Sequence, residues 1–158
     1  MADNRTVEQR SHNMRMVKSK NTTPELIIRR GLHFLGLRYK LHDKKLPGTP
    51  DLVFPKFKAI LFVHGCFWHQ HKCARSRLPA TRAIFWKEKL SRNALRDRNN
   101  ISRLNALGWH VVVVWECAIV GKYRKPHEEL LLEIVNAILD QKVPVKEIDG
   151  NNPILSAQ

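Results

Sequence analysis

The stretch Lys58-Ala-Ile-Leu-Phe-Val63 decides the fold. It is almost wholly apolar, as expected of a strand that is covered on both faces, so we predict that it lies at the centre of a sheet. Residues 51–54 before it and the β-branched run 111–115 after it predict two more apolar strands, and residues 37–42 predict a further one.

Helices are predicted around these strands. Thr22-Thr23-Pro24-Glu25 combines cap residues, a helix-compatible proline and a first-turn acid, and it predicts a helix that continues to residue 35. A long helix is expected from Thr81 to residue 107, with a break near Ser91, and an amphipathic helix over residues 126–140. This order predicts an α/β domain in which helices cover both faces of a mixed sheet.

Length and charge indicate one domain with a polyanionic partner. The chain has 158 residues, and we assign residues 23–158 to a single domain and residues 1–22 to a basic N-terminal arm that orders on its partner. The net charge of +14 favours nucleic acid, although a merely soluble basic protein would also fit. Because we find no apolar segment of about 18 residues and no signal-peptide core, we expect a cytosolic protein without a membrane.

The three cysteines and one histidine form a candidate metal site. Cys66-x4-His71-x-Cys73 is followed much later by Cys117, and this set includes every cysteine of the chain. Soft thiolates with an imidazole suit a tetrahedral zinc ion, and four ligands fit a closed structural site. The spacing differs from that of zinc fingers, so a packed cysteine core is the alternative.

Candidate catalytic residues surround the two neighbouring strands. Pro50-Asp51 at the start of one strand fits a carboxylate that holds Mg²⁺, although a turn aspartate is an equally good interpretation. His64 and His69 suit proton transfer near neutral pH. Asp97 falls on the apolar stripe of the long helix and therefore needs a polar partner, for which we favour His64. Glu25 has the spacing of a capping box, which explains this acid without an active site.

Aromatic and basic residues alternate in and beside the irregular segment 64–80. Phe67, Trp68 and Trp86 fit a wedge that unstacks bases, while the basic residues hold phosphates. Packing of aromatic rings in the core is the alternative, and we prefer it for Phe85 and Trp109.

The chain resembles the very-short-patch repair endonucleases over residues 13–117. The resemblance rests on His64-Gly-Cys-Phe-Trp-His69, Pro50-Asp51, Pro79-Ala-Thr-Arg82, Phe85-Trp86 and Gly108-Trp…Trp115-Glu-Cys117. It implies a restriction-endonuclease-like fold, a structural zinc ion and catalytic Mg²⁺. It also implies a monomer that nicks double-stranded DNA 5′ of the thymine in a T:G mismatch, which arises when 5-methylcytosine deaminates. The implied setting is the nucleoid of a bacterial cytoplasm, where other repair proteins are further partners.

The resemblance also assigns roles to residues. Asp51 and the backbone carbonyl of Val63 would hold Mg²⁺, and His69 would be the catalytic base with Glu25 as its supporting partner. His64 and Asp97 would be further active-site groups, and the zinc ligands would be Cys66, His71, Cys73 and Cys117. The wedge would be Phe67, Trp68 and Trp86, and Met14 would lie in an arm that reaches the minor groove. Val63 stands where threonine is common, and Gln70 and Lys72 interrupt a histidine run, which leaves the flanking-sequence preference open.

Two rival functions remain at this point. A restriction-type endonuclease on the same fold would cut both strands of a fully paired site. A non-catalytic zinc-braced DNA-binding module would favour basic residues where Asp51, His64, His69 and Asp97 stand.

Overall fold

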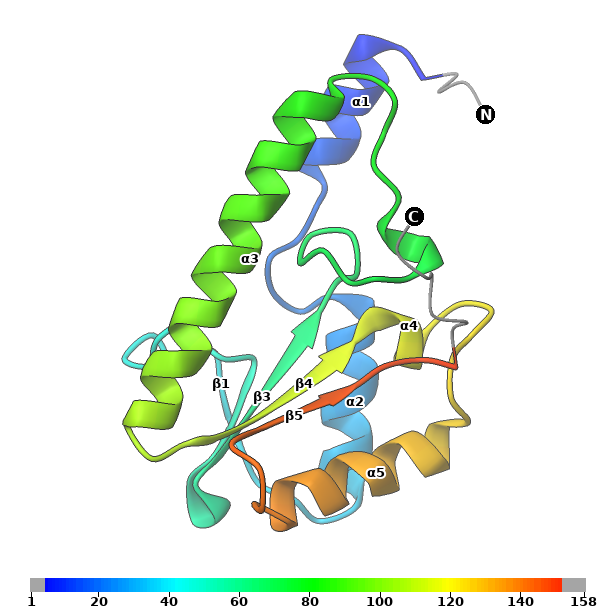
Figure 1. The fold of residues 1–158 in the computed structure, drawn as a ribbon. Helices are drawn as coiled ribbons and strands as arrows, with labels where there is room; N and C mark the ends of the chain where they lie inside the picture. Colours follow the sequence, from blue (N-terminus) through cyan, green and yellow to red (C-terminus); the bar gives the residue numbers. More distant parts are fainter. Residues whose placement is uncertain (1–4, 152–158) are drawn as a thin grey trace.

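A mixed five-stranded sheet runs through the computed structural model, which describes residues 5–151 (Figure 1). The strand order is β1-β2-β3-β4-β5, with β1, β2 and β3 antiparallel and β3, β4 and β5 parallel. The predicted central strand is therefore confirmed as β3. The strands are β1 (Lys40–Leu41), β2 (Leu52–Phe54), β3 (Ala59–His64), β4 (His110–Trp115) and β5 (Val145–Ile148).

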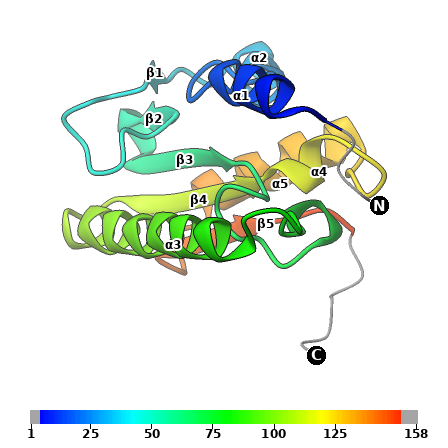
Figure 2. The ribbon, with the colours of Figure 1, turned by 90° about the horizontal axis from the view of Figure 1, so that it is seen from above.

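Alternate residues of the strands enter two separate cores. Leu61 and Val112 point to one face, where they pack with residues of α2, α4 and α5, while Ile60 and Val111 point to the other face beneath α3. Figure 2 shows α3 along one side of the sheet and α2 on the opposite side. Because both faces are covered, β3 and β4 need the continuous apolar composition that the sequence shows.

The helices confirm most of the predicted elements. α2 begins after its N-cap Thr22 and α5 after Pro126, close to the predicted positions. α3 is one unbroken helix that passes Ser91, so the expected break was wrong, and its N-cap is Arg82 rather than Thr81. The helices are α1 (Val7–Arg15), α2 (Thr23–Phe34), α3 (Ala83–Ala106), α4 (Glu116–Ile119) and α5 (His127–Leu139), with 3-10 turns η1 (Pro55–Phe57) and η2 (Ala74–Ser76).

Further elements differ from the sequence prediction, among them β1, β5 and α1. The strand expected over residues 37–42 is reduced to β1, whose two residues are exposed at the sheet edge. β5 is an unpredicted edge strand, because its polar middle residues hide the apolar pattern of a strand. α1 is an unpredicted helix in the arm, where Thr6 and Gln9 form a capping box and no helical residue is buried. No helix in residues 5–151 has the length and apolar character needed to cross a membrane.

Candidate active site and thiolate cluster

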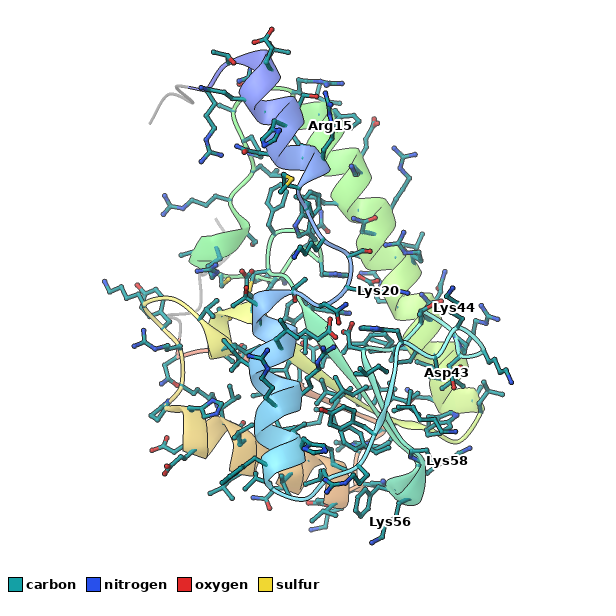
Figure 3. All side chains as sticks on the ribbon, turned by 180° about the vertical axis from the view of Figure 1, so that it is seen from behind. Arg15, Lys20, Asp43, Lys44, Lys56 and Lys58 are labelled. Carbon is teal, nitrogen blue, oxygen red and sulfur yellow. The ribbon has the colours of Figure 1, made fainter. Side chains whose placement is uncertain are left out.

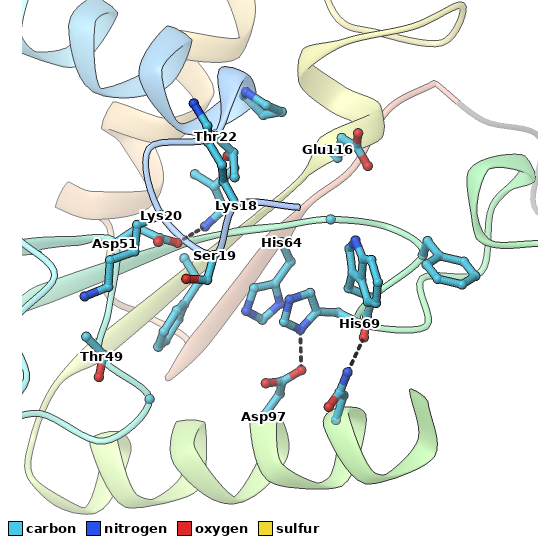
Figure 4. A pocket seen from close by; sticks show the side chains of 18 of the residues that line it. Lys18, Ser19, Lys20, Thr22, Thr49, Asp51, His64, His69, Asp97 and Glu116 are labelled. Atoms are coloured by element: carbon cyan, nitrogen blue, oxygen red, sulfur yellow. Dashed lines mark hydrogen bonds and ion pairs between the residues drawn. The ribbon is translucent and has the colours of Figure 1, made fainter. Parts of the chain in front are cut away.

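The ends of β2 and β3 meet the arm at an open cleft of about 1290 Å³ (Figure 4). Asp51 precedes β2, and His64 ends β3, so the antiparallel pairing of these strands brings both residues to the same edge. The loop after β3 contributes His69, and α3 crosses the floor of the cleft with Asp97. Four predicted catalytic residues therefore line one cleft, namely Asp51, His64, His69 and Asp97.

Asp51 is a largely buried carboxylate. Its Oδ2 accepts a hydrogen bond of 2.7 Å from the backbone N–H of Val63. Burial raises the pKa of Asp51 to about 6, and the nearby charge of Glu25 adds to this effect. The ionised form is therefore poorly stabilised by the protein alone, and a bound cation would stabilise it. A carboxylate oxygen in this setting is the donor that Mg²⁺ prefers.

His69 is paired with Asp97. Nδ1 of His69 lies 2.5 Å from Oδ2 of Asp97. We had expected His64 to be the partner of Asp97, and this expectation was wrong, because the partner is His69. Burial opposes the ionisation of Asp97, but the hydrogen bond and charge of His69 outweigh it and lower the pKa of this carboxyl. Because Nδ1 donates to the carboxylate, Nε2 of a neutral His69 is left with a lone pair for a proton.

His64 supports the ring of His69. The two imidazoles stack with centroids 3.9 Å apart and an angle of 3° between their planes. Burial lowers the pKa of His64 to about 3, and His69 adds to the effect, so His64 stays neutral at physiological pH. His64 therefore provides a neutral, buried surface on which His69 is oriented.

Within residues 5–151, Glu25 forms no hydrogen bond or ion pair with His69. Its backbone N–H donates to Thr22, as the capping interpretation predicted, but its carboxylate accepts from the backbone of Asn21 and from Arg29 and His42. The sequence interpretation missed His42. Its position at the end of the expected first strand, directly before the loop that leads to Asp51, is the signal that could have identified it.

The predicted zinc ligands come together where the loop between β3 and α3 meets α4. One ligand atom from each of Cys66, His71, Cys73 and Cys117 lies within 4.8 Å of the others. All three cysteines are free and buried. A hydrogen bond from the Cys66 thiol lowers the pKa of Cys117 to about 3, and His71 acts in the same direction, so a thiolate is stabilised here. The donor set and its closeness fit a tetrahedral zinc ion.

Trp115 connects this cluster with the cleft. Its ring stacks on His71 with centroids 4.3 Å apart and meets His64 edge to face at 5.4 Å. Its indole N–H donates to Glu147 of β5 at 3.1 Å. The cluster of Cys66, His71, Cys73 and Cys117 and the histidine stack therefore share Trp115 as a neighbour.

Aromatic residues form one wall of the cleft, and we call Phe67, Trp68 and Trp86 the aromatic wall. Phe67 and Trp68 line the cleft, and both rings contact Trp86 edge to face. Lys89 lies over Trp68 and Trp86. Phe85 is 39% exposed, so its expected place in the core was wrong, because the first turn of α3 extends beyond the sheet. Trp109 does pack against the core, as predicted.

The arm and α3 supply further residues near the cleft, one of which, Met14, was predicted to contact DNA. Met14 sits on α1, is 39% exposed, and is absent from the cleft lining. Lys18 and Lys20 line the cleft from the segment between α1 and α2. Figure 3 shows Arg15 at the end of α1 and Lys20 in the connection that follows. Asn93 of α3 also lines it and donates to the backbone carbonyl of Trp68. Asn93 lies one helical turn before Asp97 on the same face of α3, and this spacing is the signal that could have identified it.

Comparison with known proteins supplies the class. The sequence model of the family described as DNA mismatch endonuclease Vsr matches residues 2–75. The chain is 44% identical to DNA mismatch endonuclease Vsr of Escherichia coli K12, over 82% of this chain and 83% of that protein. It is 48% identical to the type II nicking enzyme V.XorIIP of Xanthomonas oryzae pv. oryzae, over 75% and 88% of the two chains. It is 40% identical to the type II nicking enzyme V.NmeAIP of Neisseria meningitidis serogroup A, over 87% and 100%.

The cleft contains a buried carboxylate and a histidine–aspartate pair. Together with these relatives, this site defines a DNA endonuclease, which is a hydrolase of phosphodiester bonds. Within that class, the chain belongs to the DNA mismatch endonuclease family Vsr, since it matches the Escherichia coli member over most of both sequences. It is therefore an endonuclease of DNA repair.

Proposed function

We propose that this protein nicks duplex DNA 5′ of the thymine in a T:G mismatch left by deamination of 5-methylcytosine. The observation that carries the proposal is the position of Asp51 and the His69–Asp97 pair in one open cleft. A buried carboxylate that needs a cation, next to a base held by a second carboxylate, is the set of groups that hydrolysis of a phosphodiester requires.

Asp51 and the backbone carbonyl of Val63 would hold Mg²⁺. When bound, the ion would stabilise charge on the scissile phosphate and lower the pKa of an attacking water. His69 would accept the proton of this water at Nε2, because its Nδ1 is engaged by Asp97. Asp97 would fix the ring and stabilise the imidazolium that forms, while neutral His64 would keep the ring in plane.

Cys66, His71, Cys73 and Cys117 would hold a structural zinc ion. A closed set of four ligands supplies folding free energy and leaves no position for a water or substrate. The ion would fix the loop between β3 and α3, which carries His69, Phe67 and Trp68. The domain assigned to residues 23–158, of which residues 152–158 lie outside the described part of the chain, would share the restriction-endonuclease fold.

The aromatic wall and the arm would deform the DNA. Phe67, Trp68 and Trp86 would enter the base stack at the mismatch, and α1 with Met14 would follow the minor groove. Lys18 and Lys20, which line the cleft, and Lys89, which lies over Trp86, would hold phosphates. The protein would act as a monomer in the bacterial cytoplasm, at the nucleoid and beside other repair proteins.

Strand-specific nicking of end-labelled duplexes tests the proposal. Duplexes with a T:G mismatch and with the matched C:G pair are incubated with and without Mg²⁺, each strand labelled in turn. We expect one cut, 5′ of the mismatched thymine, that needs both the mismatch and Mg²⁺. Cleavage of both strands of the matched duplex would instead identify a restriction-type enzyme, and binding without cleavage in any metal would identify a binding module.

A further inference from the structure

His42 is held in an unusual backbone conformation beside the catalytic carboxylate. Its φ of 48° lies in the left-handed region, which non-glycine residues adopt only when their surroundings fix them. Its backbone N–H donates to the carbonyl of Asp51 at 3.2 Å. The side chain is only 13% exposed and points inward to Glu25. His42 is therefore tied to Asp51 through the backbone.

Glu25 is the centre of a buried hydrogen-bond network. Its side chain is 2% exposed, and Oε2 accepts from the backbone N–H of Asn21 at 2.8 Å. Oε1 accepts from Arg29 at 3.1 Å and from Nε2 of His42 at 2.8 Å. Because an ionised carboxylate only accepts, Nε2 of His42 carries the hydrogen. Asn21 follows the segment that lines the cleft, so this network also fixes one cleft wall.

The network brings two carboxylates close together. The metal-binding atoms of Glu25, His42 and Asp51 lie within 4.8 Å of one another. Like charges at this distance repel in a buried setting, so the carboxylate of Glu25 stays beside Asp51 only where donors hold it. Asn21 and Arg29 hold it from the α2 side. Within the described residues, His42 is the side chain that contacts Glu25 from the β1 side, where Asp51 lies.

We propose that His42 is a positioning residue that holds the carboxylate of Glu25 beside that of Asp51, so that both negative charges act on the divalent cation at Asp51. This inference rests on the proposed function, because it takes Asp51 as the Mg²⁺ ligand. His42 acts as a hydrogen-bond donor and not as a metal ligand, since its Nε2 is engaged by Glu25 and the positive charge of Arg29 lies next to the same oxygen.

The donor role predicts a specific pattern among variants. His42→Ala should raise the Mg²⁺ concentration for half-maximal nicking about 10- to 100-fold, the range found for outer-shell partners of metal ligands. The rate at saturating Mg²⁺ should change little. His42→Gln should restore the wild-type Mg²⁺ dependence, because the side-chain amide also donates to a carboxylate. His42→Leu should behave like His42→Ala, and His127→Ala, at an exposed histidine of α5, is the matched control.

Three measurements accompany the Mg²⁺ titration. DNA affinity without divalent metal and the melting temperature identify variants that fail through binding or folding. Binding of Mn²⁺ to the DNA-free protein, followed by electron paramagnetic resonance, reports the cation site without nicking. It should weaken in His42→Ala, recover in His42→Gln and be lost in Asp51→Asn.

The outcomes separate this inference from the proposed function. If wild-type protein binds Mn²⁺ through Asp51 but does not nick a T:G duplex, the proposed function fails, and the Mn²⁺ series still decides the role of His42. An unchanged Mg²⁺ or Mn²⁺ dependence in folded His42→Ala would overturn the inference. Equal losses in His42→Gln and His42→Ala would overturn it as well, because the imidazole itself would then be a ligand.

Discussion

Nδ1 of His69 and Oδ2 of Asp97 lie 2.5 Å apart, although 28 residues separate them in the chain. The loop after β3 provides the histidine and the middle of α3 provides the carboxylate. Because a carboxylate at Nδ1 fixes both the tautomer and the ring plane, Nε2 of the neutral ring keeps its lone pair, as the proposed role of His69 as base needs. We therefore expect Asp97 to act on the proposed reaction through His69.

Asp97→Asn should slow nicking nearly as much as His69→Ala does. The asparagine amide would donate to Nδ1 and place the ring hydrogen on Nε2, so the base would lose its lone pair, and a general base contributes about 10²- to 10⁴-fold. Single-turnover nicking of a T:G duplex checks this, with the exposed Asp140→Asn as control. The two substitutions combined should cost little more than either alone, and fully additive losses would contradict the shared role.

The sequence predicts the parts of this site that depend on composition. The apolar runs of β3 and β4 predict buried central strands. The three cysteines and one histidine predicted to bind zinc do lie close together. The partner of Asp97 could not be predicted, because His64 and His69 are separated by a loop whose path no periodicity reveals. The same holds for β5, since an edge strand with polar middle residues resembles a loop in sequence.

Asp51→Asn should abolish nicking but stabilise the metal-free protein near neutral pH. The pKa of Asp51 is raised to about 6 in the folded state, so the folded protein binds a proton more tightly than the unfolded chain does. Above that pH the buried charge lowers the free energy of unfolding by up to about 3 kcal/mol, and this destabilisation disappears as the pH falls through 6 toward 4. Binding to DNA should stay largely intact, because it depends on lysine and arginine.

Urea denaturation at several pH values without divalent metal measures this effect. The free energy of unfolding of Asp51→Asn should exceed that of the wild type at neutral pH, and the difference should shrink in mildly acidic buffer. A difference that stays constant with pH would mean that Asp51 is not the group whose ionisation destabilises the protein.

One zinc ion per chain should co-purify, and Cys117→Ala should lose it and unfold at a lower temperature. The reason is that coordination by four ligands supplies folding free energy. Gly150 donates its N–H to Sγ of Cys117 at 3.3 Å, so removal of zinc should also loosen the end of β5. Elemental analysis and hydrogen exchange in β5, before and after chelation of the wild type, check both effects. Freshly purified protein without stoichiometric zinc would refute the site.

Trp68→Ala tests the proposed wedge. The ring of Trp68 is half-buried, lines the cleft and meets Phe67 and Trp86 edge to face at 5.1 and 6.0 Å. Unstacking a base step costs a few kcal/mol, and the cost is least where pairing is already poor, so an inserted ring favours the mismatch over a matched site. The variant should therefore lower the ratio of T:G to C:G cleavage while the fold survives.

Trp109→Ala is the matched control for a tryptophan that stabilises the core. Trp109 packs against the core on the α3 side of the sheet, so its truncation should cost up to roughly 3 to 5 kcal/mol of stability and lower the melting temperature sharply. The cleavage ratio of the molecules that remain folded should not change, because Trp109 is absent from the cleft lining. Thermal unfolding and the cleavage ratio measured on both variants separate the two roles. If Trp68→Ala instead lowered the melting temperature sharply and left the cleavage ratio unchanged, Trp68 would belong to the core. The wedge would then consist of Phe67 and Trp86.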